Sequence, residues 1–206
     1  MGRGGYISLS MSTFRTLCVF CGSSPGKNPA YLAGARATGI ALAQQEIGLI
    51  YGGGGLGLMG ASARAALEHG GRVVGIIPKP LMDREGIDLE VTELIVVRSM
   101  HERKRTMASM SDGFVALPGG FGTFEEVCEM ITWTQLGIHA KPMGLLNIDG
   151  FYDPLLAQFQ RAVTDGFIQE GFYRSISVAE TPEDLLKKMQ EATLPPPVVS
   201  LWEEES

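Results

Sequence analysis

Short apolar runs alternate with longer, partly polar stretches through most of the chain. The short runs predict buried strands, and the longer stretches predict helices with one apolar face. Strands and helices that alternate in this way predict an α/β fold with a parallel sheet covered by helices on both faces. The predicted strands are Thr16–Phe20, Leu49–Tyr51, Val73–Ile77, Leu94–Val97, Gly113–Leu117, Met143–Leu146 and Ile176–Val178. The predicted helices are Pro29–Gln45, Leu58–His69, Met100–Met110, Phe124–Leu136, Pro154–Gly166 and Pro182–Glu191.

The two ends of the chain lack this alternation. Residues 1–13 are rich in Gly and Ser, so we expect a flexible leader outside the fold. Residues 194–206 contain Pro195–Pro197 and Glu203–Glu205, which predict an extended, solvated tail. The stretch between them, 14–193, has the length of one domain with a substantial core.

Composition and charge exclude several classes of partner. The formal net charge is −6 and the sequence pI is about 5.1, whereas nucleic acids and anionic membranes attract clustered Lys and Arg. We therefore expect no nucleic-acid partner and no membrane. The apolar runs are also far shorter than the ~20 residues that a membrane-spanning helix needs, so the sequence favours a cytoplasmic protein.

The cysteines and histidines give little sign of metal or redox chemistry. Cys18 and Cys21 form a C-x-x-C pair, but their odd spacing on a predicted strand points them to opposite faces, which favours core packing. Three cysteines do not form a closed disulfide framework. The isolated residues His69, His101 and His139 lack zinc-ligand spacing, and we expect no metal.

Two glycine-rich loops follow the first two predicted strands, where open parallel sheets bind ligands. The first contains Gly22 and Ser23, whose N–H and hydroxyl groups suit a phosphate or ribose. The second runs from Tyr51 to Gly60 and contains a G-x-G-x-x-G match. A dinucleotide site normally has an acidic residue at the end of the following strand, but that strand ends in Ile-Pro-Lys-Pro. We therefore interpret the second loop, including Gly53, Gly54 and Met59, as a cradle for a mononucleotide or phosphate.

A third loop, Leu117–Glu126, joins a strand to a helix through the sequence Pro-Gly-Gly-Phe-Gly-Thr. Glycines allow close approach of the backbone to an anion, and the helix start adds free N–H groups and the positive end of the helix dipole. A phosphate is the expected ligand. The alternative is a tight turn in which Thr123 is the N-cap and Glu126 completes a capping box.

Helical-wheel positions distinguish two charged residues from their neighbours. On the helix after the third loop, Glu126 falls between Trp133 and Met130, while Glu125 and Glu129 share a polar arc. Partial burial there would raise the pKa of Glu126 and suit it to catalysis. On the helix Met100–Met110, Arg103 lies within a methionine stripe and needs an anionic partner, either a protein carboxylate or a ligand phosphate.

These motifs resemble the signature of the Lonely Guy family of cytokinin riboside 5′-monophosphate phosphoribohydrolases. The likeness covers nearly all of the predicted domain. It rests on Cys18–Ser24, Tyr51–Gly54, Gly57–Gly60, Met100–Lys104, Pro118–Glu126 and Thr132–Gly137.

The resemblance implies a fold, an activity and a set of site residues. It implies a Rossmann-like, doubly wound sheet in a homodimer that releases a free adenine-type base and ribose 5-phosphate with neither metal nor cofactor. It implies that Arg103 and Glu126 are catalytic. The residues expected to contact a nucleoside 5′-monophosphate are Gly22, Ser23, Gly53, Gly54, Met59, Glu85, Arg103, Lys104, Gly119, Gly120, Phe121, Gly122, Thr123, Phe124, Glu125, Glu126 and Thr132.

Two other functions remain compatible with the sequence. One is a general hydrolase of AMP, which would share these residues and differ in the pocket for the N6 substituent. The other is a nucleotide-binding or carrier protein without catalysis. Some members of the family carry the label lysine decarboxylase, but pyridoxal phosphate chemistry needs a Schiff-base lysine, and the sequence assigns none.

Overall fold

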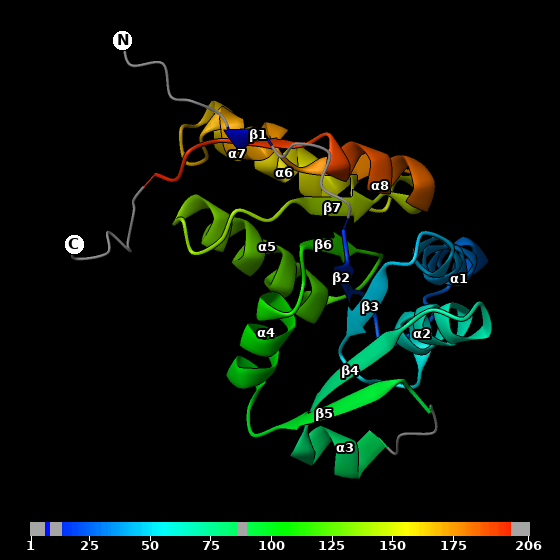
Figure 1. The fold of residues 1–206 in the computed structure, drawn as a ribbon. Coiled ribbons are helices and arrows are strands. Elements are labelled where there is room, and N and C mark those ends of the chain that lie inside the picture. The colour runs from blue at the N-terminus through cyan, green and yellow to red at the C-terminus, as the bar shows by residue number, and fades with distance from the viewer. Residues whose placement is uncertain (1–6, 9–13, 86–89, 199–206) are drawn as a thin grey trace.

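A seven-stranded parallel sheet forms the centre of the protein (Figure 1). The computed structural model describes residues 7–8, 14–85 and 90–198. The strand order is β5-β4-β3-β2-β6-β7-β8, so the chain builds outward from β2 in one direction and then returns to build outward in the other. The large-sheet strands are β2 (Thr16–Phe20), β3 (Gly48–Tyr51), β4 (Val73–Pro78), β5 (Glu93–Val97), β6 (Gly113–Ala116), β7 (Met143–Leu146) and β8 (Ser177–Ala179).

Helices cover both faces of this sheet and bury two apolar layers. One layer lies under α1, α2 and α8, and the other lies mainly under α4 and α5. The central strands are buried on both faces, as expected of a parallel sheet. The helices are α1 (Pro29–Gln44), α2 (Gly57–Glu68), α3 (Lys79–Glu85), α4 (Met100–Ser109), α5 (Phe121–Gln135), α6 (Asp153–Thr164), α7 (Glu170–Arg174) and α8 (Pro182–Gln190), with a 3₁₀ turn at Ile148–Gly150.

The observed fold confirms the predicted α/β class and doubly wound topology. The switch in strand order falls between β2 and β6, and open sheets of this kind bind ligands beyond the carboxyl ends of the strands at such a point. The short helices α3 and α7 were not predicted, because each is too short to show helical periodicity.

The start of α5 differs from the predicted one. The helix begins at Phe121 with Gly120 as its N-cap, so Gly122 and Thr123 lie inside its first turn. The capping box of Thr123 and Glu126, the alternative interpretation of this loop, is therefore wrong. Glycine is a poor helix former, and this weak propensity placed the predicted start three residues too late. At α4 the Ser99 hydroxyl caps the helix, since it accepts a hydrogen bond from the Glu102 N–H at 3.1 Å.

Cys18 and Cys21 both lie in the core, as predicted. Cys18 belongs to the apolar layer under α4 and α5, and Cys21 belongs to the opposite layer. Cys18, Cys21 and Cys128 are free thiols.

Both chain ends include residues that depart from the expectation of free, solvated termini. The pair Ile7–Ser8 forms β1, which pairs antiparallel with β9 (Thr193–Leu194). Leu194 is buried, and the Val198 N–H donates a hydrogen bond to the Gln135 carbonyl at 2.9 Å. The remaining residues of the predicted leader and tail, 1–6, 9–13 and 199–206, lie outside the described part of the chain. Within the described part, every helix is too short or too polar to cross a bilayer.

Candidate active site

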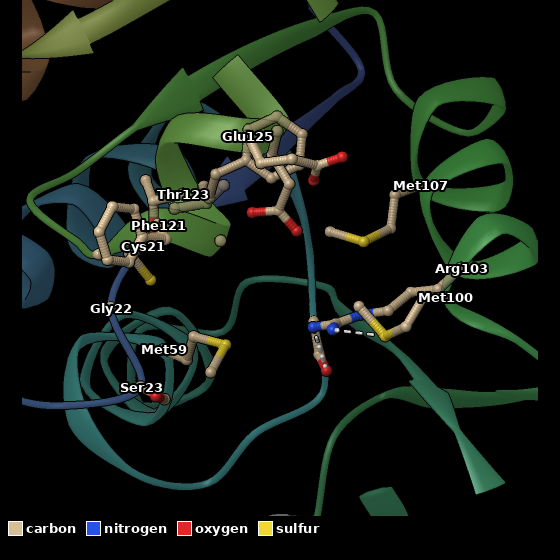
Figure 2. Close-up of a pocket in the computed structure, with 16 residues that line it drawn as sticks. Cys21, Gly22, Ser23, Met59, Met100, Arg103, Met107, Phe121, Thr123 and Glu125 are labelled. Atoms are coloured by element: carbon tan, nitrogen blue, oxygen red, sulfur yellow. Dashed lines mark hydrogen bonds between the residues drawn. The ribbon is translucent and has the colours of Figure 1, made fainter. Parts of the chain in front are cut away.

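A cavity of about 350 Å³ opens beyond the carboxyl ends of the central strands. Its walls come from the loops after β2 and β3, from the first turns of α5, and from one side of α4 (Figure 2). The loops after β2 and β6 are held together by a hydrogen bond of 3.0 Å from the Gly22 N–H to the Pro118 carbonyl. The cavity therefore occupies the switch point of the sheet, where the topology predicts a ligand.

Arg103 reaches into this cavity from α4 although its side chain is almost entirely buried, with 9% of the residue exposed. Nε donates to the Ile76 carbonyl at 3.1 Å, and Nη2 donates to the Gly52 carbonyl at 2.9 Å. Nη1 contacts the Met100 sulfur at 3.8 Å (Figure 2). Among the side chains that the structure describes, no carboxylate forms an ion pair with Arg103.

This environment distinguishes between the two partners predicted for Arg103. A buried cation needs a compensating anion, and neutral carbonyls supply only part of that compensation. The two carbonyls fix one side of the guanidinium, while Nη1 has no oxygen acceptor among the described residues. The arrangement favours an anionic ligand over a protein carboxylate as the partner of Arg103.

Gly52 sets the position of that guanidinium. A Cβ atom at Gly52 would overlap Nη2 of Arg103. We expect Gly52→Ala to displace Arg103 and lower kcat/KM for the nucleotide by about 10- to 100-fold, because a misplaced binding group loses its orientation. Gly55→Ala is the matched control in the same loop, since a Cβ there meets nothing within 4 Å. Equal kcat/KM values for the two variants would contradict this role.

The N-terminus of α5 forms the opposite wall of the cavity. Gly120, Phe121, Gly122 and Thr123 line it, and Gly120 has no side chain to cap the free N–H groups. A Cβ at Gly120 or Gly122 would meet no atom within 4 Å, so the space beside this backbone is open. Free N–H groups and the helix dipole make this end of α5 a site for an anion.

Glu126 lies one turn further along α5 and lines the same cavity. Burial raises the pKa of Glu126 to about 7, and the positive charge of Arg103 partly offsets that rise. Glu125 adds a smaller upward effect. The direction agrees with the partial burial expected from the helical wheel. Near neutral pH this carboxyl exists in both protonation states, which suits proton transfer.

Lys104 lies next to Arg103 on α4 but does not line the cavity. Its ammonium donates hydrogen bonds to Glu125 and, at 3.0 Å, to Glu129. Burial acts to lower the pKa of Lys104, but the hydrogen bonds to the two glutamates raise it overall. The structure thus places the Lys104 charge against α5, and its predicted contact with the nucleotide stays a prediction.

Most of the other predicted contact residues meet at the cavity. Those that line it are Gly22, Ser23, Met59, Gly120, Phe121, Gly122, Thr123, Glu125 and Glu126, together with Arg103.

Several predicted residues lie elsewhere. Gly119 lines a neighbouring hollow beside Gly22, and the Phe124 ring stacks on Phe151 with centroids 6.3 Å apart. Thr132 is exposed further along α5, where its hydroxyl donates to the Cys128 carbonyl at 2.7 Å. Gly53 and Gly54 belong to the loop after β3 but do not line the cavity.

Glu85 ends α3, and its side chain lies outside the described residues.

The prediction missed six residues that line the cavity: Val19, Phe20, Cys21, Gly52, Met100 and Met107. The methionine stripe around Arg103 was visible in the sequence, but it was interpreted only as the apolar surroundings of the arginine and not as part of the cavity wall. Gly52 is the first residue of the glycine run after β3, and only the fold shows that its carbonyl binds Arg103. No cluster of three or more potential metal ligands occurs among the described residues.

Comparison with known proteins places these residues in a family. A family model described as possible lysine decarboxylase matches residues 59–189. A probable cytokinin riboside 5′-monophosphate phosphoribohydrolase of Oryza sativa subsp. japonica, LOGL5, is 51% identical over 90% of this chain and 75% of its own length. The chain belongs to the Lonely Guy family.

Other members of the Lonely Guy family are similarly close. The cytokinin riboside 5′-monophosphate phosphoribohydrolase LOG3 of Arabidopsis thaliana is 50% identical over 89% of this chain and 86% of its own length. The cytokinin riboside 5′-monophosphate phosphoribohydrolase LOG of Oryza sativa subsp. japonica is 47% identical over 94% of this chain and 80% of its own length. The resemblance stated from the motifs is thereby confirmed.

Solved structures confirm the Rossmann-like fold of this Lonely Guy family member. A molybdenum cofactor carrier protein of Chlamydomonas reinhardtii superposes with a TM-score of 0.64 over 84% of this chain and 93% of its own. The two sequences are 24% identical, so the likeness concerns the fold alone.

The decarboxylase wording of the family model finds no support in the cavity. A Schiff-base chemistry needs a lysine amine at the reacting centre, and no lysine lines the cavity. Lys104 is bound by two glutamates, Lys141 donates to the Ala108 carbonyl, and Lys188 donates to the Val178 carbonyl. The residues present do not fit pyridoxal phosphate.

Proposed function

We propose that this protein hydrolyses the N-glycosidic bond of N6-modified adenosine 5′-monophosphates, which gives the free base and ribose 5-phosphate. One observation carries the proposal: a single cavity combines a buried arginine that has no carboxylate partner among the described residues with a carboxyl group whose pKa is raised to about 7. The buried arginine suits the binding of a phosphate, and the carboxyl group suits a reaction at the sugar. The printed names of the relatives LOGL5, LOG3 and LOG support the same substrate class.

Binding of the 5′-phosphate is assigned to two elements that face the cavity. Arg103 offers Nη1, and the start of α5 offers backbone N–H groups. A guanidinium and a helix N-terminus are complementary to a phosphate in both charge and hydrogen bonding. With the phosphate held there, the ribose comes within reach of Glu126.

Glu126 is assigned to the bond-breaking step. Cleavage of an N-glycosidic bond develops positive charge on the ribose ring, by analogy with glycoside hydrolysis. A carboxylate can stabilise that charge, or it can accept a proton from the attacking water. Both roles need the ionised form of Glu126 in the free enzyme.

This requirement predicts a pH dependence. The pKa of Glu126 is raised to about 7, so the active carboxylate is lost as the pH falls through neutrality. We expect kcat/KM to be level above about pH 8 and to fall about tenfold per pH unit below about pH 6. A pH–rate profile between pH 5 and 9 measures this, and a profile that is flat across pH 6–8 would contradict the assignment.

The activity is tested by chromatographic detection of free base and ribose 5-phosphate. The purified protein is incubated without added metal, with N6-isopentenyl-AMP and in parallel with AMP. Release from the modified nucleotide in preference to AMP supports the proposal. Release from AMP alone would indicate general nucleotide hydrolysis, and binding without release from either would indicate a carrier.

We also propose that the protein is a cytoplasmic homodimer, as the resemblance implies. The apolar side chains of Phe121, Ile138 and Phe167 are exposed in the single chain, and burying such side chains favours association. The free thiols Cys18, Cys21 and Cys128 fit a reducing compartment. Light scattering at micromolar concentration that gives the mass of one chain would contradict the dimer.

A further inference from the structure

Arg103 lies on α4 and Glu126 lies on α5. Helices lack the backbone pairing that joins neighbouring strands of a sheet. Both helices contribute side chains to the same apolar layer, α4 with Met107 and Ala108 and α5 with Val127 and Met130. Such packing is not directional, so it leaves the sliding and rotation of α4 against α5 weakly defined. A site that needs both residues at one substrate requires a more specific link, because errors of about 1 Å can cost about 100-fold in rate.

Lys104 supplies that link. In the described part of the chain, the side-chain hydrogen bonds that join α4 to α5 both start at Lys104, and they end at Glu125 and Glu129. Lys104 directly follows Arg103, and the two glutamates flank Glu126 along α5. Hydrogen bonds are directional, so this contact fixes the relation of the helices next to both proposed catalytic residues.

The two glutamates differ in burial. The Glu125 side chain is 55% exposed, whereas Lys104 is 10% exposed and Glu129 is 24% exposed. An exposed ion pair is weakened by water and salt, and a partly buried one is not screened to the same extent. The bond of 3.0 Å between Lys104 Nζ and Glu129 Oε1 is therefore the stronger constraint.

Glu129 also has a feature that stability alone does not explain. Its second oxygen, Oε2, is buried and has no hydrogen-bond partner among the described residues. A buried carboxylate oxygen without a partner is destabilising, and a residue of similar size without charge would avoid that cost. The presence of a carboxylate at this position points to a task that needs it.

We propose that Glu129 is a positioning residue that, through Lys104, fixes α4 against α5 and so holds Arg103 in register with Glu126. The proposal rests on the function proposed above. Glu129 does not line the cavity, so it acts on the reaction through Lys104 and the two helices rather than by touching the nucleotide.

The test compares three variants in the full chain. Glu129→Met removes the acceptor but keeps a long side chain that suits a helix, and Glu129→Gln keeps an acceptor oxygen without the charge. Glu68→Gln is the matched control, because it removes an ion pair of 3.2 Å that joins two other helices, α1 and α2, through Arg36. Each variant is examined by steady-state kinetics, thermal unfolding, and amide hydrogen exchange of the peptides from α4.

Glu129→Met is expected to lower kcat by about 10- to 100-fold, to change KM by less than about threefold, and to speed amide exchange in α4 while melting remains cooperative. Glu129→Gln is expected to lie between Glu129→Met and the wild type, because it retains an acceptor for Lys104. The control is expected to match the wild type in kcat and in the exchange of α4.

Two results would overturn the positioning role. One is unchanged exchange in α4 of Glu129→Met, and the other is faster exchange with kcat within about twofold of the wild type. A wild type that releases no base would instead reject the proposed function, and the exchange measurement would still decide whether Glu129 holds the helices together.

Discussion

Glu126→Gln is expected to lower kcat for base release from N6-isopentenyl-AMP by about 10³-fold, within the range that a general acid or base contributes. Glutamine keeps the shape of the side chain but can neither ionise nor take a proton. Glu126 lines the cavity on a helix whose start is capped by Gly120. The Glu126→Gln substitution therefore leaves the helix intact. Nucleotide affinity, measured by calorimetry, is expected to stay within about tenfold of the wild type, because the arginine and the helix N-terminus are unchanged.

A control variant separates this effect from a general response to the loss of one carboxylate. Glu183→Gln changes an exposed residue in the first turn of α8, and we expect it to retain wild-type kcat. A Glu126→Gln protein that turns over at near wild-type rates would remove Glu126 from the mechanism.

Arg103→Met is expected to lower kcat/KM for the nucleotide by about 100-fold or more, since a charge-assisted contact to phosphate contributes about 1.5–3 kcal/mol and its loss also affects the transition state. Methionine fits the apolar surroundings made by Met100 and Met107. The decisive measurement is the ratio of kcat/KM for N6-isopentenyl-AMP to that for the corresponding nucleoside. If Arg103 binds the phosphate, the variant loses most of the preference for the nucleotide.

The same helix offers the matched control. Arg105 lies two residues further on and is exposed. We expect Arg105→Met to keep both the rate and the preference for the nucleotide. An Arg103→Met protein with an unchanged nucleotide-to-nucleoside ratio would show that the phosphate binds elsewhere.

The order of helices and strands could be predicted because it follows from local patterns. Apolar runs such as Thr16–Phe20 are buried on both faces of a parallel sheet, and this burial needs a continuous apolar sequence. Errors arose where local propensity and tertiary context conflict. The start of α5 is the clearest case, because its first turn contains Gly122 although glycine has a low helix propensity.

The sequence by itself determined the α/β class, the glycine loops at the strand ends, and the two charged residues that lie among apolar neighbours. These features are local, since each depends on residue type and on spacing along one element. Arg103 and Glu126 could therefore be selected before their surroundings were known.

Only the tertiary structure decided which groups surround Arg103 and Glu126. The carbonyls of Ile76 on β4 and of Gly52 in the loop after β3 reach Arg103, and the Lys104 charge is directed to Glu129 rather than into the cavity. Such contacts join residues far apart in sequence, and their geometry depends on how whole helices and strands pack. A raised pKa at Glu126 was expected from the pattern, but its size depends on burial and on the distant charge of Arg103.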